Sequence, residues 1–174
     1  MPATNDPQDL APAQLSWQRV APRYVTVRLL NQVVSTVVWT AIASIPVLLV
    51  LLRLWDGDVP WWLWLPPAVV VLWGLVKLVL IPRRVRAIGY AEAPTELWLR
   101  KGLLFRTVTV VPYGRMQYVE ISTGPVLNAF GLASVTLHTA SAGTDAVLPG
   151  LPRAEADRLR EQLTERGEAH MVGL

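Results

Sequence analysis

Two long apolar runs dominate the first half of the chain. Residues 32–52 contain no charged side chain, and residues 60–81 contain only Lys77. A helix of about 21 residues is roughly 31 Å long, which matches the roughly 30 Å hydrocarbon core of a bilayer. Because backbone N–H and C=O groups must be paired inside lipid, both runs are predicted to be membrane-spanning helices. We expect spans at about 32–52 and 60–81, which together form a helical hairpin over residues 31–82.

Shorter alternating patterns follow the second apolar run and predict β-strands. Leu97 and Leu99 fall on one side of such a strand, and Val135 and Leu137 share one side of another. Strands are expected at residues 95–100, 104–111, 116–122, 132–140 and 145–148. Turns are expected at Lys101-Gly102, Pro112-Tyr113-Gly114, Gly124-Pro125 and Ala142-Gly143. Short strands at this spacing favour an antiparallel sandwich or barrel.

One amphipathic helix is predicted after the strands, from Arg153 to Arg166. Its apolar residues Ala156, Leu159 and Leu163 recur at helical spacing, and Gly167 is expected to stop it. A helix this charged should lay its narrow apolar stripe on an open end of the sheet. Residues 83–174 are therefore expected to form one small cytoplasmic domain.

The first 30 residues are expected to be a disordered, cytoplasmic leader. Residues 2–14 are rich in Pro, Ala, Asn and Gln, a composition typical of disorder. The leader is no signal peptide, because it has scattered charges and neither an apolar core nor a small-residue cleavage site. The first span is therefore expected to be an uncleaved anchor.

The basic residues flank the outer ends of the hairpin. The loop at residues 53–59 holds one Arg against two Asp, whereas three Arg precede the first span and three follow the second: Arg19, Arg23, Arg28, Arg83, Arg84 and Arg86. Because Lys and Arg in short loops stay on the cytoplasmic side, both termini are predicted to be cytoplasmic, with two spans in the plasma (inner) membrane. An aromatic belt at the outer interface is expected from Trp55, Trp61, Trp62 and Trp64.

Composition excludes several classes of function. Residues 83–174 carry 11 basic and 9 acidic side chains, which is too balanced for a nucleic-acid surface. The absence of cysteine excludes disulfides, thiolate metal sites and a Cys nucleophile. The chain also lacks a Gly-rich phosphate loop, H-E-x-x-H and G-x-S-x-G. We therefore predict no catalytic residue, no cofactor and no metal.

Four linked segments carry a family resemblance. They are Arg115-Met116-Gln117-Tyr118-Val119-Glu120, Gly124-Pro125, Phe130-Gly131-Leu132-Ala133 and His138-Thr139-Ala140. In this order and at this spacing they resemble the YdbS-like bacterial PH-domain membrane proteins. The resemblance runs from the first span to the end of the chain. It departs at Asn128 and Ala129, where many relatives carry basic residues.

The resemblance implies a PH-like fold, in which a strongly bent antiparallel sheet is capped by a C-terminal helix. The expected fold class is thus a membrane protein of α plus β type, with an N-terminal transmembrane hairpin followed by a PH-like sandwich or barrel. The resemblance also implies a membrane-protein partner with several such domains, or self-association through them.

Two sets of residues are candidates for lipid or partner contact. Arg83, Arg84 and Arg86 are placed to meet anionic head groups, each contributing about 1 kcal/mol, although topology control alone would explain them. Arg115 and Gln117 open the motif strand, and fixing the turn is their alternative role. A structural role is expected for Gly124, Pro125, Phe130, Gly131 and His138, the glycines because that segment needs tight turns.

Two further groupings have structural explanations. His138 alone on a strand is more often a hydrogen-bonded structural residue than a base. Pairing with Glu120 is possible, but the sequence supplies no nucleophile to complete such a pair. In the first span, the stripe of Thr36, Thr40 and Ser44 predicts packing between the two spans.

The sequence thus favours a non-enzymatic PH-like binding or scaffold module at the cytoplasmic face of the plasma membrane. Expected partners are the lipid bilayer, a membrane protein or a second copy, and possible anionic lipid, but no nucleic acid. The alternatives are an accessory subunit of a membrane transporter or export system, and a membrane-surface enzyme with a polar pocket around His138, Glu120 or Arg115.

Overall fold

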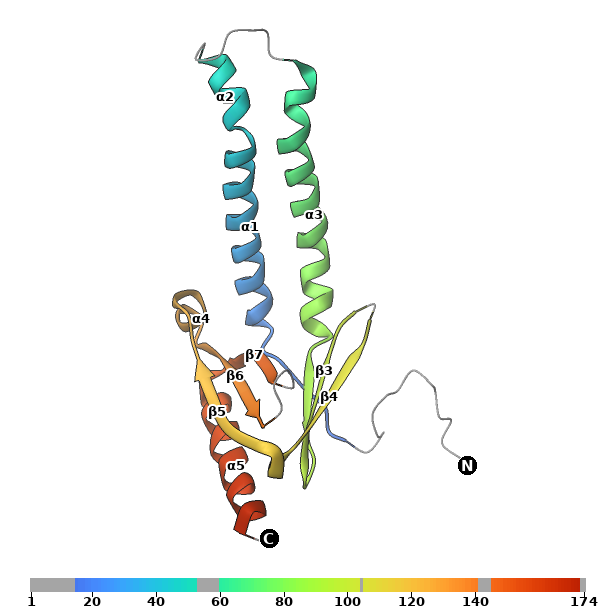
Figure 1. The fold of residues 1–174 in the computed structure, drawn as a ribbon, viewed down its shortest axis with the longest axis vertical. Coiled ribbons are helices and arrows are strands. Elements are labelled where there is room, and N and C mark those ends of the chain that lie inside the picture. The colour runs from blue at the N-terminus through green and yellow to red at the C-terminus, as the bar shows by residue number, and fades with distance from the viewer. Residues whose placement is uncertain (1–14, 53–59, 104, 141–144, 173–174) are drawn as a thin grey trace, which may run out of the picture. The chain divides into compact units, whose positions relative to one another are not determined.

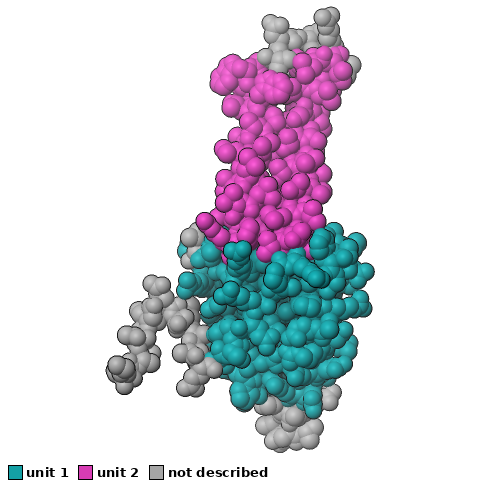
Figure 2. All heavy atoms as spheres, turned by 180° about the vertical axis from the view of Figure 1, so that it is seen from behind, with its two compact units in different colours: residues 1–24, 84–174 teal, residues 25–83 magenta. Residues whose placement is uncertain are grey.

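The chain forms two compact units in a computed structural model. The structure describes residues 15–52, 60–103, 105–140 and 145–172, with only the backbone described over residues 168–172. Unit 1 comprises residues 1–24 and 84–174, and unit 2 comprises residues 25–83 (Figure 2). The predicted turn at Ala142-Gly143, Trp55 and the leader segment 2–14 lie outside the described residues.

Unit 2 is helical. Its elements are α1 (Arg23–Ala43), α2 (Ile45–Leu51), the 3-10 helix η1 (Trp61–Trp64) and α3 (Leu65–Arg86), and α1 lies alongside α3 in Figure 1. Two helices are long and apolar enough to cross a membrane, Arg23–Ala43 and Trp61–Arg86. In the most apolar 18-residue stretch of each helix, only 6% and 11% of the residues are buried. Core helices of soluble proteins are mostly buried, so these two helices differ from them.

Proline and small residues shape the helix pair. Pro46 cannot donate to the carbonyl four residues earlier, and the helix is interrupted at Ser44 before α2 begins. A Cβ atom on Gly74 would lie 2.5 Å from Thr36 Cγ2, so α1 and α3 approach closely there. The Thr36 and Ser44 hydroxyls donate back to the carbonyls of Gln32 and Thr40, both at 2.8 Å. The expected packing role of this stripe is confirmed at Thr36.

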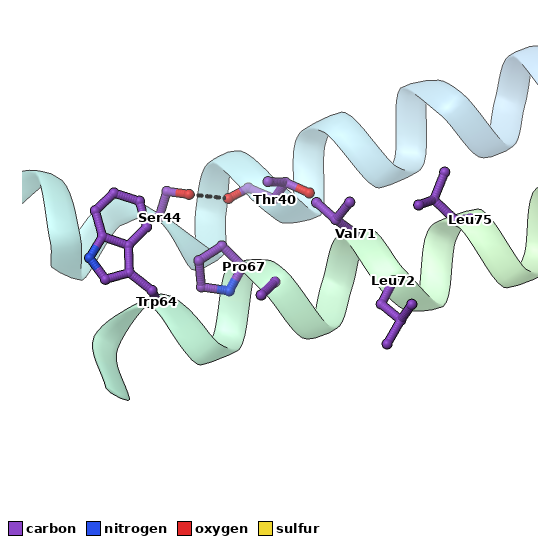
Figure 3. A pocket seen from close by; sticks show the side chains of 8 residues that line it. Thr40, Ser44, Trp64, Pro67, Val71, Leu72 and Leu75 are labelled. Carbon is purple, nitrogen blue, oxygen red and sulfur yellow. Dashed lines mark hydrogen bonds between the residues drawn. The ribbon is translucent and has the colours of Figure 1, made fainter. Parts of the chain in front are cut away.

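A groove of about 550 Å³ lies between the helices beyond that contact (Figure 3). Its walls are almost entirely apolar, and they include Trp64, Pro67, Val71 and Leu75 from η1 and α3. Thr40 Oγ1 is buried without a hydrogen-bond partner among the described residues.

The predicted helix boundaries need correction. The helix α1 begins at Arg23 rather than Gln32, and α3 continues through Pro82 to Arg86. The disorder predicted over residues 1–30 is therefore wrong from Gln18 onward, where β1 (Gln18–Arg19) pairs with β2 (Gly89–Glu92). The cause is that a charge-free run marks where lipid can begin, not where a helix begins. The first turns of α1 contain arginines, but they also contain the buried residues Tyr24 and Val27.

Unit 1 contains two antiparallel sheets. The first has the order β1-β2-β3-β4 and the second the order β5-β6-β7. The remaining strands are β2 (Gly89–Glu92), β3 (Glu96–Lys101), β4 (Thr107–Pro112), β5 (Met116–Ser122), β6 (Leu132–Thr139) and β7 (Ala146–Pro152). The helical elements are η2 (Tyr113–Arg115), α4 (Pro125–Ala129) and α5 (Arg153–Val172). The predicted fold class, strands followed by one helix after an apolar helix pair, is confirmed.

The core of unit 1 lies between the sheets and α5. Leu97 and Leu99 of β3 are buried as their alternation predicted, and so are Val135 and Leu137 of β6. The helix α5 contributes Ala156, Leu159 and Leu163, each with 0% exposure. Full burial of one leucine side chain stabilises the fold by about 1.5–3 kcal/mol, so this stripe fixes α5 on the sheets.

Two glycine predictions are wrong. Gly167 does not stop α5, because it is buried inside the helix, where its Cβ position lies 3.8 Å from Met116 Cε. Gly124 is not in a tight turn: its φ of −100° suits any residue, and it caps the unpredicted helix α4. Gly131, by contrast, ends that segment with φ +65°, a conformation that favours glycine.

Candidate functional site

The outer surface of the second sheet and its groove against α5 form the candidate site. β5 is an edge strand of this sheet, so one side of its backbone has no strand partner in the described residues. Beside it lies a groove of about 240 Å³ lined by Met116, Gln117, Tyr118, Val119, Leu163, Thr164 and Gly167. The pairing of β5 with β6 shifts register between Met116 and Tyr118, which makes Gln117 a bulge residue with an exposed side chain.

An ion-pair network holds α5, the second wall of this groove, against the first sheet. Arg158 donates from Nη2 to Glu92 Oε1 at 2.8 Å and from Nε to Glu155 Oε2 at 3.0 Å. The Tyr90 hydroxyl lies 2.7 Å from Glu155 Oε1 and 2.6 Å from Gln18 Oε1. Hydrogen bonding from Arg158 holds the pKa of Glu155 below its usual value, although partial burial opposes this. Burial and the hydrogen bond to Glu155 raise the pKa of Tyr90.

A row of side chains crosses the outer face of the second sheet. Tyr118 of β5 pairs in register with His138 of β6, and their rings stack with centroids 4.3 Å apart and 20° between their planes. Asp145 precedes β7 and places Oδ2 2.9 Å from His138 Nδ1, and its Oδ1 accepts the Thr139 N–H at 3.2 Å. Glu120, two residues along β5, places Oε2 3.2 Å from His138 Nε2.

Two carboxylates thus face the two ring nitrogens of His138. Desolvation lowers the pKa of His138, but the hydrogen bonds and charges of Glu120 and Asp145 outweigh it and raise the pKa overall. The imidazolium form satisfies both carboxylates at once because both of its nitrogens donate. His138 is therefore a cross-strand clamp between Glu120 and Asp145, and the pair with Glu120 that the sequence left open is present.

In this arrangement the His138 ring binds its two neighbouring carboxylates. Both His138 nitrogens are occupied, and no Ser, Thr or Tyr hydroxyl is hydrogen-bonded to them in the described part of the chain. No cluster of three or more His, Asp or Glu that could hold a metal occurs among the described residues. What the surface offers is an exposed Tyr ring, a bulged strand edge and a shallow groove, which are features of a contact surface.

The structure separates the residues predicted for lipid or partner contact. Gln117 lines the groove against α5, whereas Arg115 lines a different groove of about 290 Å³ beside β4. The backbone carbonyl of Arg115 accepts the Ala140 N–H at 3.3 Å, whereas the role of its side chain stays a prediction. Arg83, Arg84 and Arg86 are exposed on the last turns of α3. None of the three lines either groove. Their contacts with lipid or protein stay predictions.

The motif residues expected to be structural are placed as follows. Gly124 and Pro125 open α4, Phe130 ends it, and Gly131 leads into β6. Exposed Asn128 and Ala129, where the motif departs from the family pattern, lie on α4.

Sequence reasoning missed Tyr118 and Asp145 as members of the clamp. The signal was present for Asp145, because an antiparallel hairpin joining two predicted strands brings it opposite His138. The sequence analysis used Asp145 only as the first residue of a short final strand.

Comparison with known proteins agrees with this architecture. A family model described as a bacterial PH domain matches residues 25–167, which include both long apolar helices and most of the β-rich part. The UPF0699 transmembrane protein YdbS of Bacillus subtilis (strain 168) is 35% identical over 98 residues, or 56% of this chain. The match covers 60% of that relative, less than two thirds of its length. No solved structure gives a significant match.

Proposed function

Because the chain belongs to the bacterial PH domain family, we propose that it is a membrane-anchored, non-enzymatic module that docks a membrane-protein partner through the groove between β5 and α5. A membrane location agrees with its two long apolar helices and with its transmembrane relative. The proposal places both termini and the PH-like domain on the cytoplasmic side of the plasma membrane. Arginines flank the outer ends of the helix pair, as the positive-inside rule requires for that orientation.

The observation that carries the docking proposal is the edge position of β5 beside a groove. An unpaired strand edge accepts an extended segment by β-augmentation, and alternate side chains of that segment would enter the groove. The bulge at Gln117 interrupts this edge and so limits indiscriminate pairing with other edges. A partner confined to the same membrane needs only weak contacts, because tethering raises the effective concentration.

Site-specific photocrosslinking tests the partner. A photoreactive residue is placed at Gln117 or Thr164, which line the groove, and at Val147, an exposed control on β7 that does not line it. The expected result in native membranes is one cross-linked membrane protein, or a second copy of this chain, at Gln117 and Thr164 but not at Val147. Equal cross-linking at all three positions would refute docking at this groove.

Labelling tests the orientation separately. The chain contains no cysteine, so Glu161→Cys provides a single thiol on exposed α5. We expect a membrane-impermeant maleimide to react with it only after the inner membrane is permeabilised. Labelling of intact spheroplasts from outside would refute the cytoplasmic placement of unit 1.

A further inference from the structure

The turn between β3 and β4 presents the most exposed large apolar side chain among the described residues. Phe105 is 89% exposed and Leu103 is 37% exposed. Exposed Lys101 ends β3 and exposed Arg106 precedes β4. These four residues are called the tip below; Leu104 lies outside the described residues. One exposed apolar residue is ordinary, but an aromatic and an aliphatic side chain framed by cations suit a membrane interface.

Strand pairing and a tight backbone approach at Gly102 flank the tip. Gly102 has φ +106°, and a Cβ atom there would lie 1.9 Å from the Phe105 carbonyl oxygen, so the turn closes tightly on itself. Lys101 and Thr107 form the last register pair of the two strands. The strand pairing therefore fixes Lys101 and Thr107 at the base of the turn, and the close approach at Gly102 explains why glycine is required there.

The tip extends from the end of the first sheet at which the chain connects to the apolar helices. One row of register partners crosses the sheet at this end: Arg19, Gly89, Arg100 and Val108. Arg19 is followed closely by the start of α1 at Arg23, and Gly89 closely follows the end of α3 at Arg86. Both covalent connections therefore leave the sheet from the same end as the tip.

This end of the sheet is cationic. Residues 97–119 contain no acid, and Arg100, Lys101 and Arg106 of this stretch lie at or next to this end. The acids nearest in sequence, Glu92 and Glu96, lie at the opposite end of their strands, where Glu96 pairs in register with Pro112. Arg84 and Arg86 of unit 1, next to the connection with β2, add exposed positive charge. The charge complements an anionic lipid surface, which attracts each such cation by about 1 kcal/mol.

We propose that the tip is a second membrane contact: Leu103 and Phe105 enter the interface of an anionic bilayer, and Lys101 and Arg106 bind lipid phosphates. The inference rests on the membrane anchorage proposed above and adds to it the surface by which the β-rich unit meets lipid. This contact would limit how unit 1 can turn on its two connections, and it leaves the β5 edge available to a partner.

Fluorescence quenching from single positions tests the contact on the full chain. Leu103→Cys carries an environment-sensitive fluorophore in nanodiscs that hold one copy, with phosphatidylcholine alone or mixed with phosphatidylglycerol, and with nitroxide-bearing lipid as the quencher. Val147→Cys, on an exposed residue of β7, is the matched control. We expect blue-shifted emission and strong quenching at position 103 in anionic discs only, and neither at position 147.

Charge and aromatic variants sharpen the test. Reversing both cations with K101E and R106E is expected to weaken the contact by at least roughly 30-fold, since two cations at about 1 kcal/mol each convert at about 1.4 kcal/mol per tenfold. Phe105→Ser is expected to reduce the quenching at position 103 while leaving the lipid charge dependence in place.

The outcomes separate the possibilities. Quenching at position 103 no stronger than at position 147, or equal in the two lipid mixtures, overturns the inference. A blue shift that appears only in discs with two copies, or only with another protein present, means that protein covers the tip and also overturns it. Failure of the wild-type chain to enter nanodiscs would refute the membrane anchorage itself, which is a different result.

Discussion

Two glycines with nearly the same backbone angle provide a direct test of packing in unit 1. Gly131 has φ +65° and Gly150 has φ +72°, so an alanine is strained by a similar amount at each position. A Cβ atom at Gly131 would meet nothing within 4 Å, whereas at Gly150 it would lie 2.3 Å from Tyr24 Cγ. The difference between the two alanine variants therefore isolates the steric conflict with the Tyr24 ring.

The expected magnitudes follow from these geometries. The left-handed conformation costs alanine about 1–2 kcal/mol, and the lower entropy of the unfolded chain returns about 0.4–1 kcal/mol. Gly131→Ala should therefore reduce the free energy of unfolding by about 1 kcal/mol. Gly150→Ala should add an overpacking cost of about 1–3 kcal/mol, because a buried aromatic ring and the backbone of β7 cannot both stay in place.

The assay is urea unfolding of the full chain in a mild detergent, followed by pulsed hydrogen exchange of β6 and β7 peptides. With a slope of about 1–2 kcal/mol per molar urea, the overpacking cost of about 1–3 kcal/mol should separate the two midpoints by about 0.5–3 M. In a Tyr24→Ala background, the extra cost of Gly150→Ala over Gly131→Ala should shrink because the ring atoms at 2.3 and 2.6 Å are gone, although the Cβ atom of residue 24, at 2.7 Å, keeps part of it. Equal midpoints for the two single variants, or no relief in the Tyr24→Ala background, would refute the reasoning.

Three other variants test the remaining contacts. Tyr90→Phe removes a hydroxyl that lies between Gln18 and Glu155 and should lower the free energy of unfolding by about 1–2 kcal/mol, measured in the same urea assay; an unchanged midpoint would contradict it. His138→Gln should destabilise unit 1 most below about pH 6.5, because a group with a raised pKa stabilises fully below its unfolded pKa and loses this effect as the pH rises through its folded value. A wild-type minus variant difference that grows from pH 6 to 9 would contradict this sign. Gly74→Val should weaken helix packing in unit 2 by about 1–3 kcal/mol, read as a lower thermal midpoint of the helical circular dichroism signal in detergent, and a small residue at Thr36 should restore it.

The parts of the fold that repeat a simple pattern were predictable from the sequence. The strand at Met116–Ser122 was expected with the bounds it has, and the stripe of Ala156, Leu159 and Leu163 was expected to be buried. Alternation and helical spacing are local signals, so neither depends on the rest of the fold. The family resemblance implied a compatible PH-like fold, and the family match confirms the resemblance.

The parts that depend on long-range pairing were not predictable in this way. The strand β1 is only two residues long, and its partner β2 lies beyond both apolar helices, so no local pattern marks either strand. The clamp on His138 was only half anticipated, because Asp145 enters through hairpin register rather than through a motif. The docking groove arises where α5 passes an edge strand, which sequence periodicity does not encode.

The pairing of β1 with β2 makes unit 1 discontinuous in the chain, with the Tyr90 hydroxyl bonded to a residue 72 positions earlier. During synthesis, the first strand of the sheet must wait until both apolar helices have left the ribosome before its neighbour exists. Completion of this sheet therefore follows synthesis of both helices. A chain whose second helix failed to insert would be left with an open strand edge on the N-terminal side, a state that quality-control proteases and chaperones can recognise.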